Sequence, residues 1–430
     1  MFRVVIVVGA CCLAVAGPAA AAEAKSIWEQ ETVTGDWGGA RTALKDRGVD
    51  VSMTYIGEVF DVLTGGLARR ASYEGRFDLT VDADLDKLLG WKGASASFTV
   101  FQIHSSSRNV AENVGSLADP SNIDAVQTTR LFSAWVQQNF LDDRISLRVG
   151  QLGFDAESFT SATSGGLING TFGWATVLAA NMISGGPAYP LAAPGARLAI
   201  KPTDNITVIG AILSGDPAEP NCNDLPQICN RYGLTFSFSG GALLMSEVQY
   251  AVNSGTQAAG LPGTYKAGYW HETASFPDQR FPAVMHDGNW GVYGIADQMV
   301  WRGGAASLNL FLRTGISPSD RNLISWYVDG GFGIKGLVAG RPEDVLTFGV
   351  AYQKISPDAV AADRDAGLAV IRSSEVVFEL SYQAQLAPWW VLQPDIQYIV
   401  HPGGDVPHPD NPLMPVKNAT VIGLRSTMKF

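Results

Sequence analysis

Long hydrophobic runs are nearly absent from this 430-residue sequence. Beyond residues 4–16, no stretch approaches the roughly 20 apolar residues that a membrane-spanning helix needs. Only helices and closed β-barrels satisfy all their backbone polar groups inside lipid. The chain after this segment is therefore expected to be either an exported soluble protein or a barrel. The apolar segment itself lies between Arg3 and Ala20-Ala21-Ala22, which predicts a secretory signal peptide over residues 1–22, cleaved after Ala22.

Cysteine is also scarce. Two of the four cysteines, Cys11 and Cys12, lie in the expected signal peptide. The other two, Cys222 and Cys229, lie in the stretch EPNCNDLPQICN, and in an exported protein such a pair predicts a disulfide that closes a small loop. No histidine lies near them, which disfavours a zinc site, and we expect neither a metal nor a cofactor.

Basic residues are outnumbered, with 30 Lys and Arg against 41 Asp and Glu. An acidic exported chain without a basic patch argues against nucleic-acid binding. Histidine is rare as well: the five are His104, His271, His286, His401 and His408. No G-x-S-x-G elbow or two-histidine zinc motif accompanies them, so an enzyme, such as an outer-membrane lipase or protease, is disfavoured.

What the sequence does contain is alternation. In YEGRFDLTVDADL, residues 73–85, every odd position is apolar or glycine and every even position is polar or charged. Because successive side chains of a strand point to opposite sides, this pattern predicts a strand with one apolar face and one charged face. The same pattern recurs at 49–59, 144–149, 307–313, 375–386 and 391–398. Together with 47 glycines and no long helical periodicity, it indicates an all-β protein.

The connections between these stretches fall into two kinds. Short turns are expected at 141–143, 202–205, 302–304 and 387–388, and long Gly/Pro/Asn-rich connections at 105–129, 152–195, 214–230, 272–289, 353–374 and 401–418. Short turns at one end and long loops at the other are typical of an outer-membrane barrel. We count about seventeen candidate strands; since single-chain bacterial barrels have an even number, we predict sixteen and place the conflict between 231 and 290.

The last ten residues, VIGLRSTMKF, decide what lies against each face. The chain ends within an amphipathic strand on an aromatic residue, Phe430, which is the signal by which outer-membrane barrels are recognised for assembly. An exposed terminal strand of this kind would be an aggregation hazard in a soluble protein, whereas pairing it with the first strand removes both edges. We therefore expect a transmembrane antiparallel β-barrel over residues 49–430, in the bacterial outer membrane, with lipid outside and water inside.

A short segment, residues 23–48, precedes the expected barrel. Asp36 can cap a helix over 40–47, and Gly48 can end it. Packing at the periplasmic mouth of the barrel and partial occlusion of the pore both remain open for this segment.

Several longer stretches carry a resemblance to a known family. WEQETVTGDWGGARTALKDRGVDV, LPGTYKAGYWHET, GLVAGRPEDVLTFGVAY and YQAQLAPWWVLQPDIQYIVHPGG occur in this order. The chain from about Trp28 to Phe430 thereby resembles the carbohydrate-selective porin family, OprB. The resemblance implies a sixteen-stranded barrel that passes mono- or oligosaccharides by facilitated diffusion, and it leaves open whether three barrels associate as a homotrimer. His401 departs from the family pattern, in which asparagine is expected, and the Cys222–Cys229 loop has no assigned counterpart in it.

A selective sugar pore needs a constriction whose side chains replace part of the solute's water. Charged side chains serve the sugar hydroxyls and aromatic faces serve the ring. From alternation, the candidates for the pore wall are Glu58, Glu74, Arg76, Asp78, Arg148, Arg197, Arg313, Glu379, Asp395, Gln397 and Arg425. The group Glu74, Arg76 and Asp78 is predicted to form the narrowest ring. A wide solvated wall without selective contacts is the alternative.

The longest connection, 152–195, is too apolar for a disordered loop. If it folds inward, it brings Phe172 and Trp174 toward the solute; if it packs against the inner wall, neither touches the solute.

Two other classes of protein would show part of the same sequence pattern. A soluble sugar-binding sandwich explains the alternation but not the strand that ends on Phe430, and a general non-selective porin has the same fold with a different constriction.

Overall fold

The computed structural model describes residues 26–219, 222–238, 240–255 and 260–430. The expected signal peptide, residues 1–22, lies outside the described residues and stays a prediction. Within the described residues, sixteen antiparallel strands close into one barrel, which confirms the predicted fold class and strand number. No described helix is long or apolar enough to cross a membrane.

The barrel strands follow one another around the wall in chain order. They are β1 (Val49–Gly66), β2 (Ala71–Asp84), β3 (Ala94–Ser105), β4 (Thr128–Phe140), β5 (Ile145–Leu152), β6 (Ala193–Thr203), β7 (Ile206–Ser214), β8 (Ala242–Val252), β9 (Gly263–Pro277), β10 (Met285–Gly303), β11 (Ala306–Ile316), β12 (Ile324–Lys335), β13 (Val345–Ile355), β14 (Ser374–Ala387), β15 (Trp390–Val400) and β18 (Lys417–Lys429). A separate hairpin pairs β16 (Pro407–His408) with β17 (Asn411–Pro415).

The barrel closes where the first strand meets the last. β1 pairs with β18 through a register that sets Tyr55 opposite Met428 and Glu58 opposite Arg425. Apolar side chains at alternate positions face outward: Val59, Leu424 and Ile422 are exposed on this seam. Because the protein core cannot cover them, these side chains meet lipid, and the charged face is turned inward.

The helices are short. They are α1 (Ala40–Asp46), α2 (Leu85–Leu89), α3 (Val110–Val114), α4 (Thr176–Ala179), α5 (Pro226–Cys229), α6 (Pro357–Asp365) and α7 (Pro402–Asp405), with 3-10 turns η1 (Ile27–Glu29), η2 (Trp37–Gly39), η3 (Ser164–Gly166), η4 (Gly170–Phe172) and η5 (Ile183–Gly185). The sequence dictates the ends of several of them. In α2, the Asp84 carboxylate accepts hydrogen bonds from Asp86 N at 3.0 Å and Lys87 N at 3.2 Å, and Gly90 ends the helix in a left-handed conformation.

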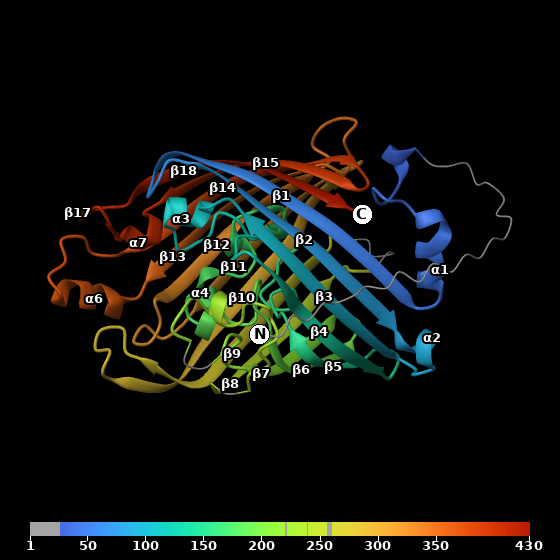
Figure 1. Ribbon diagram of the computed structural model, residues 1–430, viewed down its shortest axis with the longest axis horizontal. Coiled ribbons are helices and arrows are strands. Elements are labelled where there is room, and N and C mark those ends of the chain that lie inside the picture. The colour runs from blue at the N-terminus through green and yellow to red at the C-terminus, as the bar shows by residue number, and fades with distance from the viewer. Residues whose placement is uncertain (1–25, 220–221, 239, 256–259) are drawn as a thin grey trace, which may run out of the picture.

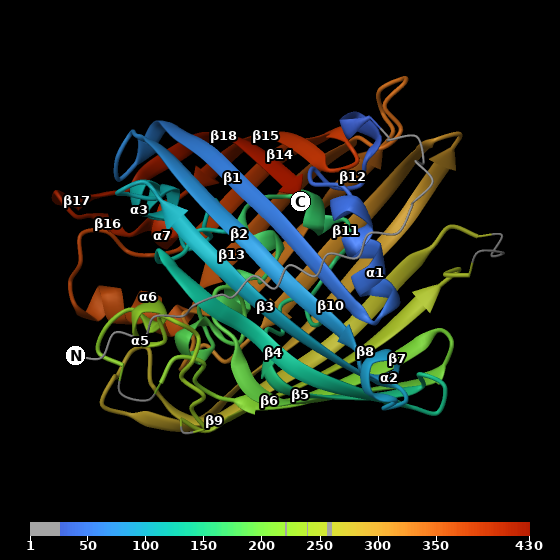
Figure 2. The same cartoon turned by 45° about the vertical axis from the view of Figure 1, so that its right-hand side comes forward.

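Long and short connections are segregated, as the sequence predicts. Figures 1 and 2 show α3, α6, α7 and β17 at one end of the barrel, and α1 and α2 at the other. The end with α1 carries the short turns and both described chain termini, so it is the periplasmic end. One predicted long connection, 272–289, is wrong: β9 and β10 extend through it and leave 278–284 as the loop, because both strands continue beyond the lipid-facing band.

The undecided region 231–290 contains three barrel strands, β8, β9 and β10. The stretch 232–238 alternates like a strand but is not part of the barrel sheet. Its carbonyls at Tyr232 and Gly233 accept hydrogen bonds from Leu131 N and the Gln151 amide, both at 3.0 Å. Alternation alone therefore does not distinguish a barrel strand from a loop that runs along the rim.

Candidate functional site: a narrowed pore

The connection between β5 and β6, residues 153–192, folds into the barrel and builds a core of its own. Phe159, Ile168 and Phe172 are at most 1% exposed. The Phe172 ring packs edge-on against Phe311 of the barrel wall, with ring centroids 6.3 Å apart. This loop therefore fills the side of the lumen next to β8–β14, and Phe172 lies inside that filling instead of at a water-facing surface.

Glycine permits the close approach of the loop to the wall. A Cβ at Gly349 of β13 would lie 2.5 Å from Leu167 and 2.8 Å from Phe172. A side chain here would push the loop core off the strand, so a small residue at this point lets the loop seat against β13.

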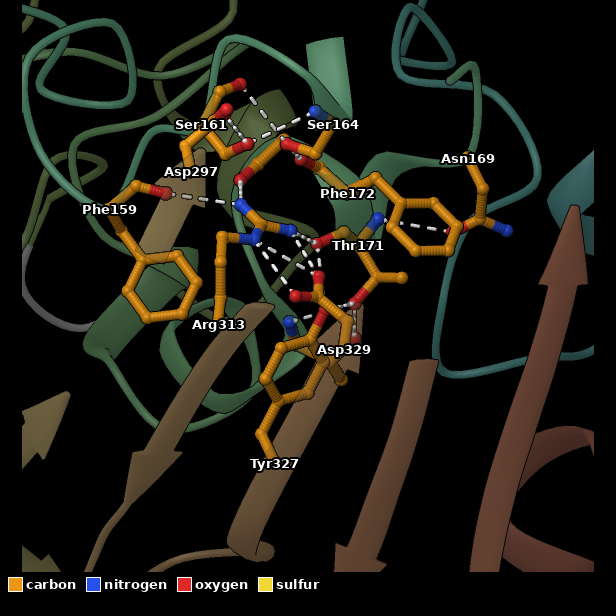
Figure 3. A network of polar contacts seen from close by, with 12 residues as sticks. Phe159, Ser161, Ser164, Asn169, Thr171, Phe172, Asp297, Arg313, Tyr327 and Asp329 are labelled. Atoms are coloured by element: carbon orange, nitrogen blue, oxygen red, sulfur yellow. Dashed lines mark hydrogen bonds and ion pairs between the residues drawn. The ribbon is translucent and has the colours of Figure 1, made fainter. Parts of the chain in front are cut away.

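A buried arginine fastens this loop to the barrel (Figure 3). Arg313 of β11 is fully buried and forms an ion pair with Asp329 of β12. Its guanidinium also donates to three loop carbonyls, those of Phe159 at 3.1 Å, Gly173 at 2.9 Å and Thr171 at 2.9 Å. Since a buried charge is tolerated only when it is paired and hydrogen-bonded, the loop backbone and Asp329 together make this arginine stable inside the lumen.

Wall carboxylates hold the same loop by its backbone N–H groups. Glu379 of β14 accepts from Ile168 N at 2.5 Å and Asn169 N at 2.9 Å. Asp297 of β10 accepts from Thr163 N at 2.9 Å and the Thr163 hydroxyl at 2.7 Å. These contacts come from two strands, β10 and β14, that are not neighbours in the wall, and they fix the loop at Thr163 and at Ile168-Asn169.

Gln397 and Asp395 of β15 belong to this set of anchors. The Gln397 amide accepts from the Asn169 side chain at 2.9 Å and donates to Pro120 O at 2.8 Å and to Asp395 at 3.0 Å. Gln397 is thus bonded to the 153–192 loop through Asn169 and to the loop between β3 and β4, residues 106–127, through Pro120.

The second inward loop, residues 106–127 between β3 and β4, is held in the same way. Glu74 of β2 accepts from Val110 N at 2.8 Å. Glu58 of β1 accepts from the Ser121 hydroxyl at 2.6 Å and is bonded to Arg425 of β18, which also donates to the Asn122 side chain at 2.5 Å. The anchors of the two loops thus include side chains that the sequence predicts to line the pore: Glu58, Glu74, Arg313, Glu379, Asp395, Gln397 and Arg425.

A cavity of about 530 Å³ remains where the two loops face the wall of β1, β2 and β18. We call it the pore cavity. The wall contributes Ile56, Arg76 and Arg425, and the loops contribute most of the rest, among them Asp119, Asn122, Asp124, Asp155, Trp174 and Tyr189. Both charge signs and two aromatic side chains therefore meet at one level of the lumen.

Arg76 is the wall residue with the most distinctive surroundings. Its guanidinium lies 4.7 Å from the centre of the Phe101 ring and 4.6 Å from that of the Tyr189 ring. Asp78, two residues along the same strand, accepts hydrogen bonds from Nε at 2.7 Å and Nη2 at 2.8 Å. The group is thus fixed in position by two cation–π contacts and a bidentate ion pair, and the residue lines the cavity.

The loop carboxylates in the pore cavity are only partly balanced by cations. Burial raises the pKa of Asp124 to about 7, although Ala111 N and the Asn109 side chain donate to it. Burial and the neighbouring carboxylates raise the pKa of Asp119 well above its usual range. Burial also raises the pKa of Asp155. The charge of this cavity therefore depends on pH near neutrality.

A second charged cluster lies on the wall of β4, β5 and β6. Glu157 of the long loop pairs with Arg148 at 2.6 Å and with Arg197 at 2.7 Å. The Arg148 guanidinium lies 3.8 Å from the centre of the Trp135 ring. Trp135 also lines a smaller cavity with Asp82 and Asp84, which places it on the inner face.

The residues at the cavity divide into those that sequence periodicity finds and those that it misses. Arg76 and Arg425 lie on strands and are found from alternation, and Trp174 from the apolar content of its loop. Asp119, Asp124 and Tyr189 are missed, because inward loops have no repeating side-chain direction that a sequence pattern could reveal. Within the described residues, no group of three or more His, Cys, Asp or Glu side chains is arranged to hold a metal ion.

Comparison with solved structures finds the same barrel fold in other proteins. The chain is similar to Pseudomonas putida OprB in its high-pH structure, with a TM-score of 0.81 at 24% identity, over 94% of this chain and 100% of the other. The low-pH structure of the same protein gives a TM-score of 0.59 at 22% identity, over 94% and 99% of the two chains. The closed barrel, together with the match of residues 68–430 to a porin family, defines an outer-membrane porin, not an enzyme.

The particular family follows from the sequence match. Residues 68–430 match the carbohydrate-selective porin family, OprB, and the chain belongs to it. Porin B of Pseudomonas aeruginosa is 28% identical over 92% of this chain and 90% of its own length. A protein of Acinetobacter baylyi called putative porin QuiX is 23% identical over 95% of both chains. The predicted outer-membrane location is confirmed with the family.

Proposed function

We propose that sugars cross the outer membrane passively through this barrel and that the pore cavity is where they are selected. The observation that carries the proposal is the joint presence of Arg76, Arg425, Asp119, Asp124 and Trp174 around one narrow space. A sugar presents hydroxyls that both donate and accept, and ring faces that are apolar. A lining of donors, acceptors and an aromatic face matches all three.

Arg76 has the role of principal donor. Its guanidinium carries five N–H groups, and Asp78 takes two of them at 2.7 and 2.8 Å. The two neighbouring rings and Asp78 hold the guanidinium in place, so a sugar hydroxyl meets a preorganised donor and loses little binding energy to side-chain ordering. Asp119 and Asp124 supply acceptors from the opposite loop. The contacts must remain weak, since a solute that binds tightly does not leave the pore.

The Glu157, Arg148 and Arg197 cluster beside Trp135 is a further station for hydroxyl contacts on the way to the periplasmic end. Its ion pairs measure 2.6 and 2.7 Å, and the stacked Trp135 ring resembles the arrangement at Arg76. A row of such stations lets a sugar exchange one set of hydrogen bonds for the next.

Liposome swelling with the purified protein tests the proposal. We expect sugars to enter faster than uncharged solutes and amino acids of matched size. Arg76→Lys retains the charge but loses the planar fork and the stacking, so we expect sugar to block ion current about tenfold more weakly, with the barrel intact. Arg69→Lys, at an exposed position in the β1–β2 connection, is the matched control and should leave the block unchanged.

Uptake ordered by size alone would leave a general non-selective porin, and equal sugar block in the Arg76 and Arg69 variants would remove Arg76 from the selective contacts.

Two further proposals concern assembly. The strand that ends on Phe430 is the segment we expect the barrel-assembly machinery to bind, and association into a homotrimer would be tested by cross-linking in native membranes.

A further inference from the structure

A second cavity adjoins the pore cavity. It measures about 300 Å³ and shares Trp174, Ala179, Tyr189, Pro190 and Gln227 with its larger neighbour. We call it the side cavity. The five shared residues place the two cavities side by side.

The side cavity differs from the pore cavity in chemistry. Its remaining lining residues are Ser184, Gly185, Ala188, Leu191, Leu225 and Pro226. Among the described residues, no charged one lines it, whereas the pore cavity has Arg76, Arg425 and three aspartates. One compartment is therefore suited to hydroxyl groups and the other to an apolar group.

One wall of the side cavity comes from the disulfide-closed turn between Cys222 and Cys229. The turn carries Leu225, Pro226 and Gln227, and Gln227 accepts a hydrogen bond from Val126 N of the 106–127 loop at 2.7 Å. Figure 2 shows its helix α5 at the end of the barrel that bears the long loops. The disulfide thus holds an apolar wall in place at the outer side of the pore.

Three of the surrounding polar side chains already bond within the protein. Trp174 Nε1 donates to Gly185 O at 2.9 Å, the Tyr189 hydroxyl donates to Ile123 O at 2.7 Å, and the Ser184 hydroxyl donates to Asp216 at 2.8 Å. What these residues offer to a solute is therefore ring face and hydrocarbon. Leu225, at 59% exposure, adds further apolar surface.

We infer that the side cavity binds the apolar aglycone of a glycoside while the sugar ring of the same molecule occupies the pore cavity. The inference rests on the proposed function and names the class of sugar that the pore favours, a glycoside with a flat hydrophobic substituent. A second sugar ring fits less well, because it would bring several hydroxyls against walls that leave them without partners.

Block of single-channel ion current by methyl β-glucoside and by phenyl β-glucoside tests the inference. The two share the sugar and differ in the aglycone. In the unmodified protein we expect phenyl β-glucoside to block at concentrations about threefold to tenfold lower, the range expected for one aromatic contact. Leu225→Ser should remove this preference and leave the block by methyl β-glucoside unchanged. Serine is a good N-cap, so the substitution preserves α5, whose N-cap is residue 225.

Leu234→Ser is the matched control. Leu234 lies in the same loop, is 62% exposed and lines neither cavity, so its replacement should leave the preference intact. A second variant, Cys222→Ser with Cys229→Ser, frees the turn and should also reduce the preference for the phenyl compound.

The outcomes separate the two proposals. Equal block by both glucosides in the unmodified protein, or equal loss in Leu225→Ser and Leu234→Ser, would overturn the aglycone site and leave the sugar pore in place. Stronger block by a disaccharide than by phenyl β-glucoside would overturn it in favour of a second sugar ring. Absence of block and of uptake with methyl β-glucoside would overturn the proposed function itself.

Discussion

Glu379 and Arg76 both point to the inner side of a strand, yet their surroundings differ. Glu379 is 1% exposed and accepts two backbone N–H groups of the 153–192 loop. Arg76 lies against two neighbouring aromatic rings and lines the pore cavity. The first side chain holds a loop, and the second is available to a solute. Whether a wall residue anchors a loop or contacts a solute therefore depends on which groups it bonds to inside the barrel.

Asp124 makes ion selectivity depend on pH. Its pKa is raised to about 7 by burial, so it changes from charged to neutral as the pH falls from 8 to 6. We expect the pore to prefer cations less at pH 6 than at pH 8, and Asp124→Asn to abolish most of this change. The measurement is the reversal potential in planar bilayers under a salt gradient.

The same shift affects how firmly the 106–127 loop is docked. A carboxyl whose pKa is higher in the docked state binds a proton more tightly there, so docking is strongest below its free pKa and weakens as the pH rises through about 7. Asp119 shifts in the same direction. A reversal potential that is independent of pH in the unmodified protein would refute the role of both residues. Asp142→Asn, an exposed change in the turn between β4 and β5, is the control.

The candidate site could be predicted from sequence only where a strand presents it. Alternation assigns Arg76 and Arg425 to the inner face because the side-chain period of a strand is two. It does not show that Glu379 would meet Ile168, 211 residues earlier, since that contact depends on how a loop folds back. Phe172 shows the converse: its loop does fold inward, but the ring packs against Phe311 inside the filling.

At the scale of elements, the 153–192 loop depends on anchors supplied by strands. Replacing both members of the buried pair, Arg313→Leu with Asp329→Leu, removes the bonds to three loop carbonyls without leaving an unpaired charge. We expect docking of the loop to weaken by about 2 kcal/mol or more, since each hydrogen bond to a charged group contributes about 1.5–3 kcal/mol. Single-channel conductance should rise, and proteases should cleave within 153–192 while the barrel stays intact.

Arg302→Leu provides the comparison for this experiment. Arg302 is exposed at the periplasmic end of β10 and contacts no inward loop, so conductance should not change. Unchanged conductance and protease resistance in the double variant would show that the remaining anchors, Glu379 and Asp297 among them, suffice to hold the loop.

The elements themselves were largely predictable. Strands such as β2 and β14 have an uninterrupted alternation that only one register satisfies. The strand boundaries within 231–290 could not be predicted, for two reasons. β9 and β10 extend past the lipid-facing band, where an apolar outer face is not required. The stretch 232–238 alternates like a strand but does not join the barrel sheet.

At the scale of the whole molecule, the segment before the barrel is bonded to the end of the last barrel strand. Val33 N donates to Lys429 O at 2.8 Å, and Arg41 of α1 donates to Phe430 O at 2.5 Å and to the Thr32 hydroxyl at 2.6 Å. The Trp28 ring stacks on Trp389 with centroids 5.9 Å apart. This segment therefore spans the periplasmic side of the seam at which β1 meets β18.

A cavity of about 910 Å³ lies between this segment and the barrel wall, lined in part by Arg41, Asp50 and Lys429. Arg41→Ala removes the bonds to Phe430 and Thr32, which together contribute about 1–3 kcal/mol. We expect the barrel to convert to its unfolded, slower-migrating form at a lower temperature on a denaturing gel, whereas Arg47→Ala, an exposed change at the end of α1, should have no effect.

Sugar flux distinguishes the two roles considered for this segment, packing at the periplasmic mouth and partial occlusion of the pore. Unchanged flux in Arg41→Ala means that the segment clamps the seam, and increased flux means that it also occludes the periplasmic mouth, because freeing it then widens the path.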